Sequence, residues 1–175
     1  MDSIFQRVGF TRAYKNILQM YKNQPFLCTF MSVHLLCALE YEFPDRDFKI
    51  KTGDLFYKTD LLFLQNFDLN TRLGDETDEF RSEWDGHCWV ELDDRYILDI
   101  SLMRTVYSDA FNNECKQDII NTFGHNKGLL IIDKTDPNII KNFQFRWIER
   151  NVLQDKVING IVKAIDKYKD QLINI

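Results

Sequence analysis

The chain opens with two stretches in which apolar residues follow helical spacing. In residues 2–23 apolar side chains recur mostly at steps of three and four, which predicts an amphipathic helix. Residues 26–43 are apolar on nearly every side, which is typical of a buried central helix. Cys28 stands near the start of this second helix, and Thr29 beside it is a candidate N-cap.

The middle of the chain changes to the two-residue alternation of strands. Residues 47–58 alternate imperfectly and predict a strand with a bend at Gly53, whereas residues 59–85 follow no regular pattern. Two short apolar runs then flank a pair of aspartates in the sequence HCWVELDDRYILDI. We expect residues 87–92 and 95–100 to form a β-hairpin around this tight Asp-Asp turn.

The last third of the chain predicts four further elements. They are a helix over 108–122, a buried strand over 128–133, an alternating strand over 142–149 and a long closing helix over 151–172. Helices therefore come first and an antiparallel sheet follows, so the expected fold is α+β, with the buried helix that carries Cys28 packed on the sheet. The length of 175 residues is that of about one domain, which we take to span the whole chain.

Composition and charge exclude several classes of function. The hydrophobic share of 45% and the 14 phenylalanines predict a globular protein with a bulky core. A net charge of −5 argues against a general nucleic-acid binder, which needs a basic surface to neutralise phosphates. The sequence has neither a signal-peptide pattern nor an apolar run of the ~18 residues that span a membrane, so we expect a cytoplasmic protein without a membrane contact. The acidic run 75–85 predicts an exposed loop that attracts basic partners.

The four cysteines are irregularly spaced, and none forms a CxxC pair. This spacing suggests neither a zinc site nor a redox motif, and we expect no metal and no cofactor. In a cytoplasm all four are expected to be reduced. Cys37 lies inside the apolar helix and is expected to be a core residue. Cys88 should point to the opposite strand face from His87, in the core or at the surface, and Cys115 lies in a polar stretch and is expected to be inert. Cys28 is therefore the candidate nucleophile.

Nucleophilic thiol chemistry needs a thiolate, and an ordinary cysteine with a pKa of about 8.5 is mostly protonated at neutral pH. A helix start and a nearby imidazole both favour the thiolate, and a carboxylate or amide can orient the imidazole. Cys28 stands at a predicted helix start, His87 opens the hairpin, and Asp99 lies near its end. Pairing around the turn puts His87 opposite about residue 100, so an offset of one residue or a bulge makes His87 and Asp99 neighbours.

Two more residues are candidates for the same site. Trp89 shares the strand face of His87 and could wall the site, although ordinary sheet packing explains it equally well. Gln24 precedes Cys28 by four residues and is a candidate side-chain donor to an oxyanion, with a linker role as the competing interpretation. The backbone N–H of Cys28 is the main candidate oxyanion donor.

The segment GHCWVELDDRYILDIS resembles the His-x-Trp-Val-Glu … Asp segment of transglutaminase-like proteins, which belong to the wider papain-like group of thiol enzymes. The helix CTFMSVHLLCAL is similar to the helix that carries the cysteine in that family. The resemblance covers residues 20–101 and implies that Cys28 is the nucleophile, His87 the base and Asp99 the orienting group. The chain departs from the family pattern at Cys88, where a small residue such as alanine is common, in its long acidic segment, and in lacking a glycine after the cysteine helix.

The resemblance implies an enzyme without a cofactor that attacks an amide carbonyl of a protein or peptide through a thioester. A peptidase, a deamidase and a transglutaminase-type acyltransferase all fit this description. A catalytically degenerate binding or inhibitor protein on the same fold, which uses its acidic face, is the main alternative. A small-molecule acyltransferase of the arylamine-acetylating type is a third, for which the chain is short and has no basic Gly-rich segment. The sequence fixes neither the acyl acceptor, nor the oligomeric state, nor the role of residues 102–175.

Overall fold

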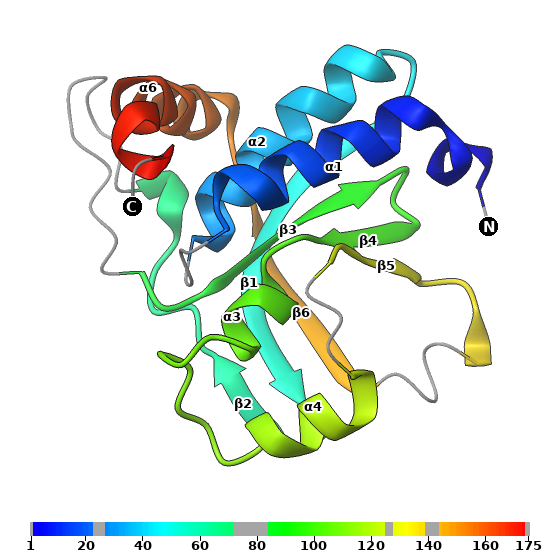
Figure 1. The fold of residues 1–175 in the computed structure, drawn as a ribbon, viewed down its shortest axis with the longest axis vertical. Helices are drawn as coiled ribbons and strands as arrows, with labels where there is room; N and C mark the ends of the chain where they lie inside the picture. The colour runs from blue at the N-terminus through cyan, green and yellow to red at the C-terminus, as the bar shows by residue number, and fades with distance from the viewer. Residues whose placement is uncertain (1, 23–26, 72–83, 125–127, 139–143, 174–175) are drawn as a thin grey trace.

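A computed structural model describes residues 2–22, 27–71, 84–124, 128–138 and 144–173 of the chain. The fold is mixed α+β, and six antiparallel strands form one curled sheet that resembles half of a barrel (Figure 1). The helix that carries Cys28 packs on this sheet, as predicted. None of the helices within the described residues is long and apolar enough to cross a membrane.

The helix predicted over residues 2–23 is in fact two elements. A 3-10 helix spans Ser3–Gln6, and α1 spans Val8–Met20. Between them Arg7 has an extended backbone, with φ −77° and ψ 140°. The Asp2 carboxylate accepts a hydrogen bond from the Ile4 N–H at 3.0 Å and so caps the short first turn as a separate unit. The first prediction was therefore wrong at this end, while the amphipathic character of α1 is confirmed.

The buried central helix is confirmed as α2, Cys28–Glu42. Its N-cap residue is Leu27, which provides no side-chain hydrogen bond, and Cys28 is the first helical residue. The expectation that Thr29 caps the helix is wrong, because Thr29 already lies within the first turn. The first N–H groups of α2 have no i−4 carbonyl to bind, and the N-cap side chain does not replace one.

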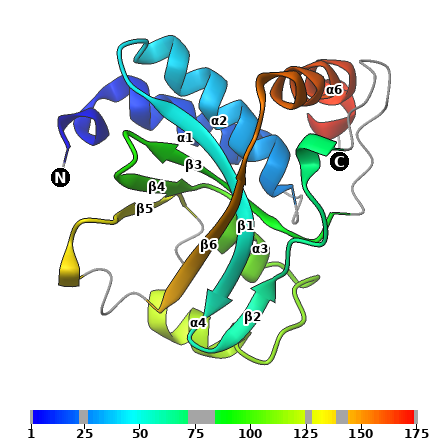
Figure 2. The ribbon, with the colours of Figure 1, turned by 180° about the vertical axis from the view of Figure 1, so that it is seen from behind.

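The strands are β1 (Phe48–Tyr57), β2 (Asp60–Phe63), β3 (His87–Leu92), β4 (Tyr96–Asp99), β5 (Leu130–Asp133) and β6 (Phe145–Val152). Their order is β2-β1-β3-β4-β5, and β6 pairs with β1 as well. Figure 2 shows β6 running beside β1 at the back of the molecule. Since β5 and β6 join the same sheet as the predicted hairpin, the C-terminal part of the chain completes the sheet.

Two helical layers cover the two sides of the curled sheet. On one side, α1, α2 and α6 (Asp155–Ile173) bury the larger core against the side chains of Cys88, Val90 and Leu92. On the other side, α3 (Leu102–Val106) and α4 (Lys116–Phe123) bury a second core against the far half of β1 and against β6. The start of β3 lies where these two layers meet (Figure 1).

The structure corrects three further predictions. Residues 59–85 are not wholly irregular, because Lys58 takes a positive φ of 55° and turns the chain back so that β2 pairs with the end of β1. The helix predicted over 108–122 forms only in its second half, as α4, and α3 is a helix that the pattern did not predict. The strand predicted over 142–149 lies further along, as β6.

The predicted hairpin is confirmed, with a loop that is one residue longer than expected. Asp93 and Asp94 both have φ of 51°, and Leu92 pairs with Tyr96, so Arg95 belongs to the loop. Continued to the start of β3, this register puts residue 101 opposite His87, so His87 and Asp99 lie on the same face of the hairpin as diagonal neighbours.

The predicted bend at Gly53 is a register shift between β1 and β6. The shift falls between Thr52 and Gly53, and Gly53 also pairs with His87 of β3. A Cβ atom at position 53 would lie 1.9 Å from the carbonyl oxygen of Ile148. Glycine therefore allows β6 to approach β1 closely at the level of His87.

Replacing Gly53 by alanine is expected to lower the free energy of unfolding by about 3 kcal/mol, since the added methyl group meets backbone rather than a flexible side chain. The denaturant midpoint measures this loss. Gly9→Ala is the matched control, because its added Cβ would meet the movable carboxylate of Glu42 and alanine favours the α1 helix. An equal loss in both variants would contradict the close approach at Gly53.

Candidate active site

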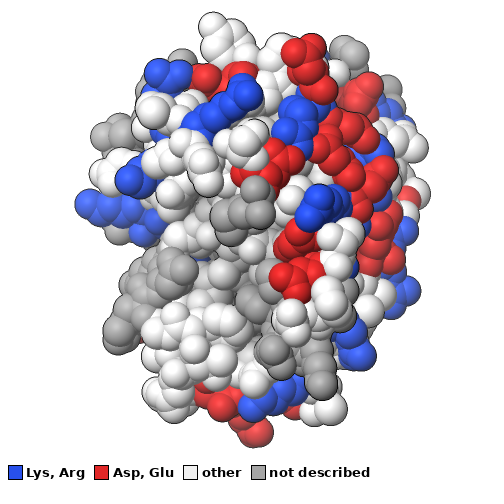
Figure 3. All heavy atoms as spheres, turned by 90° about the vertical axis from the view of Figure 1, so that its right-hand side faces the viewer, with Lys and Arg blue, Asp and Glu red and all other residues white. Residues whose placement is uncertain are grey.

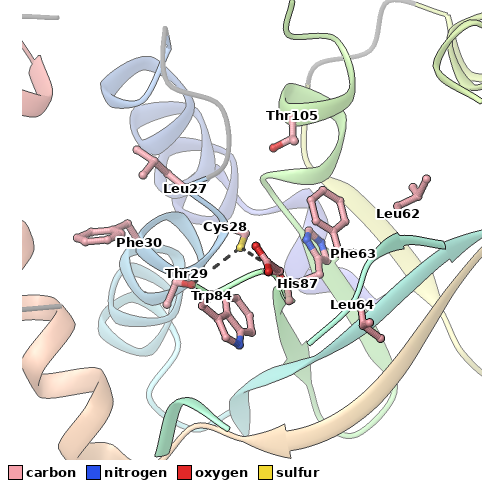
Figure 4. A pocket seen from close by; sticks show the side chains of 12 residues that line it. Leu27, Cys28, Thr29, Phe30, Leu62, Phe63, Leu64, Trp84, His87 and Thr105 are labelled. Carbon is pink, nitrogen blue, oxygen red and sulfur yellow. Dashed lines mark hydrogen bonds between the residues drawn. The ribbon is translucent and has the colours of Figure 1, made fainter. Parts of the chain in front are cut away.

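A cleft of about 400 Å³ opens between the start of α2, the end of β2 and the start of β3 (Figure 4). Its walls are mostly apolar, and its described lining contains no lysine and no arginine. The lining residues are Leu27, Cys28, Thr29, Phe30, Leu62, Phe63, Leu64, Trp84, Asp85, Gly86, His87 and Thr105. A cleft of this size is typical of a small-ligand or side-chain site. Cys28 and His87, predicted from the sequence as partners, both line it.

Cys28 presents its thiol at the first residue of α2. Its side chain is nearly buried, with 8% of its surface exposed. The sulfur lies 3.9 Å from the carbonyl oxygen of Gly86 and 3.9 Å from Oγ1 of Thr29. Because Gly86 immediately precedes His87, this contact places the thiol beside the start of β3.

His87 is buried and held by Asp99. Its Nε2 lies 2.6 Å from Oδ2 of Asp99, and the two side chains are 1% and 0% exposed. The predicted contact between these two residues is therefore confirmed. With Nε2–H donating to the carboxylate, Nδ1 is the nitrogen left for another partner. It is buried with no close hydrogen-bond contact among the described residues, and Cys28 is the neighbouring side chain that acts on the ring.

Asp99 is fixed by donors from two other elements. The indole Nε1 of Trp147, on β6, donates to Oδ2 at 2.9 Å. The backbone N–H groups of Ser101 and Leu102 donate to Oδ1 at 3.2 and 3.0 Å. The carboxylate thus ends β4, caps α3 and orients His87 at the same time.

These contacts set the charges of the pair. Burial on its own lowers the pKa of His87, but the Asp99 carboxylate and the nearby Cys28 thiol raise it to about 10. Burial on its own raises the pKa of Asp99, but His87, the Trp147 indole N–H and the Leu102 N–H lower it below its ordinary value. The geometry therefore favours an imidazolium beside a carboxylate.

Aromatic rings hold the imidazole from two directions. Phe63, at the end of β2, stacks on His87 with ring centroids 5.1 Å apart. Trp89 stacks with the same ring at 6.3 Å and is 2% exposed. Trp89 is not among the residues that line the cleft. It is buried beside His87 on β3 and supports the imidazole by stacking, but it does not form a wall of the pocket.

A buried hydrogen bond fixes α2 to β3 beside the two reactive groups. Oγ of Ser32, one turn after Cys28, donates to the carbonyl oxygen of Cys88 at 3.0 Å. Cys88 faces α2, on the opposite side of β3 from His87, and burial raises the pKa of its thiol well above the ordinary value. Cys88 is therefore a core thiol, whereas Cys37, predicted as a core residue, is only partly buried and packs against the core.

Sequence reasoning missed several residues of the site. Trp147, Phe63 and Thr105 come from segments that the pattern did not connect with Cys28. The rule that a buried indole N–H needs a partner could have drawn attention to Trp147. Gln24 lies outside the described residues, as do all residues of the acidic segment 75–85 except the last two.

The described acidic surface is largely neutralised by neighbouring cations. Figure 3 shows blue side chains between the red ones on the face near the N-terminus and the β3–β4 turn. Arg46 pairs with Asp2 and Asp93 there. Further pairs join Lys49 with Asp47 and Asp94, and Arg95 with Asp133. This face offers a mixture of charges to a partner, not a uniformly acidic one.

Comparisons with known proteins returned no match, whether to family models, to curated proteins or to solved structures. Within the described ranges, no three His, Cys, Asp or Glu side chains are grouped as metal ligands would be. The chemistry of the cleft must therefore be argued from its own residues.

Proposed function

We propose that this protein is a thiol acyl-transfer enzyme in which Cys28, His87 and Asp99 act as nucleophile, base and orienting carboxylate. One observation carries the proposal: Cys28 at the start of a buried helix shares a cleft with a buried His87 whose Nε2 is bound to Asp99 and whose Nδ1 has no described partner. The arrangement supports a transglutaminase-like, papain-like fold, which the resemblance of residues 20–101 implies.

In the first half of the reaction, the Cys28 thiolate attacks the carbonyl carbon of an amide, and His87 carries the proton on Nδ1. The new carbon–sulfur bond pushes an electron pair onto the carbonyl oxygen, which the backbone N–H of Cys28 at the helix start stabilises. When the carbon–nitrogen bond breaks, the departing amine takes the proton from His87. A thioester on Cys28 and a neutral imidazole remain.

In the second half, water or an amine attacks the thioester and transfers its proton to Nδ1 of His87. The carbon–sulfur bond then breaks, and the Cys28 thiolate and the His87 imidazolium form again. Water as acceptor gives a peptidase or deamidase, and an amine gives a transglutaminase-type reaction. Because Nε2 stays bound to Asp99, Nδ1 is the nitrogen that exchanges the proton in both halves.

The cleft supports a protein or peptide substrate with an apolar group next to the reacting amide. Leu27, Phe30, Leu62, Leu64 and Trp84 supply the apolar walls. The absence of lysine and arginine from the described lining does not favour an acyl-coenzyme, whose phosphates need cations. The degenerate binding protein remains the alternative, but its acidic interface falls mostly outside the described residues, and Asp93 and Asp94 are paired with cations.

The proposal predicts that p-nitrophenyl acetate acylates Cys28 and releases a burst of about one equivalent of p-nitrophenolate. Mass spectrometry of the intact protein should find the acetyl group on the peptide that contains Cys28. Adding a primary amine then separates the two enzyme types, because a transferase consumes its thioester faster with the amine present, whereas a hydrolase does not.

Cys28→Ala is expected to abolish the burst, and Cys37→Ala, which removes the most exposed of the four thiols, should leave it unchanged. A wild-type protein without a burst, or a burst that survives Cys28→Ala, would reject the proposed function and favour the binding protein.

A further inference from the structure

One charged side chain joins the two halves of the proposed site without lining the cleft. Arg104 lies in α3, the short helix that Asp99 caps. Its guanidinium reaches away from the cleft to the end of α1, where Nη2 donates to the carbonyl oxygen of Leu18 at 2.6 Å and Nη1 donates to that of Tyr21. The next residue, Thr105, lines the cleft.

The end of α1 has a specific need for such a donor. The carbonyl groups of a last helical turn have no i+4 partner, and they form the negative end of the helix dipole. The last turn of α1 contains no basic residue of its own. Arg104 supplies both the missing donors and the positive charge from another element.

The partial burial of the Arg104 guanidinium carries a free-energy cost that no described ion pair offsets. Burial lowers its pKa, and it has no carboxylate partner within the described part of the chain. Its Nε is buried and lacks a hydrogen-bond partner among the described residues. Taking a guanidinium out of water without a counter-ion is unfavourable, so its contact with the α1 carbonyls compensates for that loss.

A second contact carries the constraint from α1 to α2. Tyr21, whose carbonyl accepts from Arg104, is fully buried, and its hydroxyl lies 3.4 Å from Nδ1 of His34 on α2. Arg104 thus connects α3, which is attached to Asp99 and so to His87, with the helix pair that presents Cys28. The start of α2 needs this support, because its N-cap residue Leu27 gives no side-chain hydrogen bond.

We propose that Arg104 is a positioning residue that holds the start of α2, and with it the thiol of Cys28, in register with His87. This inference rests on the proposed function for its catalytic meaning. Its structural content, the fixing of the N-terminal half of α2 through the contact of Tyr21 with His34, can be tested separately.

The test compares Arg104→Met with Arg104→Lys, and uses Arg12→Met as the matched control. Arg12 joins the same two helices at their far end, through Glu42 of α2. Arg104→Met should slow the alkylation of Cys28 by iodoacetamide about tenfold near neutral pH, since small displacements of reacting groups carry large penalties in rate. It should also make that rate rise with pH more steeply than in the wild type. Arg104→Lys keeps the charge and one donor and should restore most of the rate, and Arg12→Met should leave it unchanged.

Hydrogen exchange supplies the readout that does not depend on reactivity. The Met31 N–H donates to Leu27 in the first turn of α2, and the Phe43 N–H donates to Leu39 at its end. In Arg104→Met the Met31 amide should exchange faster while the Phe43 amide keeps its wild-type rate. If Arg104→Met is poorly folded, the exchange rates of the same two amides are measured in Arg104→Lys. There the Met31 amide should again exchange faster than in the wild type, by a smaller factor, and the Phe43 amide should keep its wild-type rate.

The outcomes separate the two proposals. Unchanged exchange at Met31, or an equal increase along all of α2, overturns the positioning role of Arg104, whatever the ester burst shows. A missing ester burst in the wild type together with selective loosening at Met31 rejects the acyl-transfer function but leaves the structural role of Arg104 standing. An unchanged Cys28 alkylation rate in a folded Arg104→Met protein also overturns the inference.

Discussion

Replacing His87 by glutamine is expected to slow the alkylation of Cys28 by iodoacetamide about 100-fold at about pH 6.5, because an ordinary thiol with a pKa near 8.5 is only about 1% thiolate there. In the wild type, the pKa of His87 is raised to about 10, so the imidazolium persists across the neutral range and can stabilise the thiolate. The wild-type rate should therefore depend less steeply on pH than the variant rate, which should rise about tenfold per pH unit.

Cys37 provides the internal reference in the same sample. It is more exposed than Cys28, so access alone would make Cys37 the faster of the two. Burial raises the pKa of the Cys37 thiol, which lowers its thiolate fraction, so the comparison with His87→Gln decides the cause. Faster labelling of Cys28, lost in His87→Gln while Cys37 keeps its rate, supports the ion pair. Parallel pH profiles for Cys28 in the wild type and the variant would show that His87 does not act on the thiol.

The same variant tests the charge of His87 through stability. Since the folded-state pKa of about 10 lies above the ordinary value of about 6.5, the ion pair with Asp99 stabilises the fold fully below about pH 6.5 and loses this contribution as the pH rises toward 10. The free energy of unfolding of the wild type should therefore fall relative to that of His87→Gln over this range. A constant difference would mean that His87 is neutral in the folded protein.

The elements nearest the reactive residues are the ones that sequence patterns predict best. The start of α2 and the bounds of β3 are dictated by local periodicity, and Cys28 and His87 stand at the ends of these two elements. The hairpin was predicted, but its register was open, because the pattern does not reveal whether Arg95 belongs to the loop. Two successive positive φ angles at Asp93 and Asp94 decide this, and backbone angles of this kind are weakly encoded in sequence.

The parts that the sequence could not supply depend on contacts between distant segments. Trp147 meets Asp99 across 48 residues, and Arg104 meets the end of α1 across more than 80. The start of α3 depends on the Asp99 carboxylate of the previous strand, which accepts from the Leu102 N–H. Helical periodicity does not reveal this contact, so the sequence pattern did not predict α3. Phe63 reaches His87 because β2 folds back on β1, which requires the positive φ of Lys58.

Replacing Asp99 by asparagine should be the most damaging conservative change in the site, because it alters which nitrogen of His87 carries the proton. Oδ2 of Asp99 accepts from both His87 Nε2 and the Trp147 indole. In the variant, Oδ1 can still accept from the Leu102 N–H, so the amide nitrogen takes the place of Oδ2 and meets two donors. The imidazole can relieve this conflict only by leaving Nε2 unprotonated, which moves the proton to Nδ1.

A neutral His87 with its proton on Nδ1 cannot accept a proton from Cys28, and without the carboxylate, burial favours this neutral form. We therefore expect the rate of the ester burst to fall by a factor on the order of 10²–10⁴ in Asp99→Asn. The ¹⁵N resonances of the imidazole, measured on the same protein, should report the change from an imidazolium in the wild type to a neutral ring with its proton on Nδ1. Trp147→Phe is the matched control: it removes one donor from the same oxygen, leaves the tautomer unchanged and should slow the burst about tenfold or less. Equal losses in the two variants, or an Asp99→Asn protein that keeps its proton on Nε2, would refute the orienting role of Asp99.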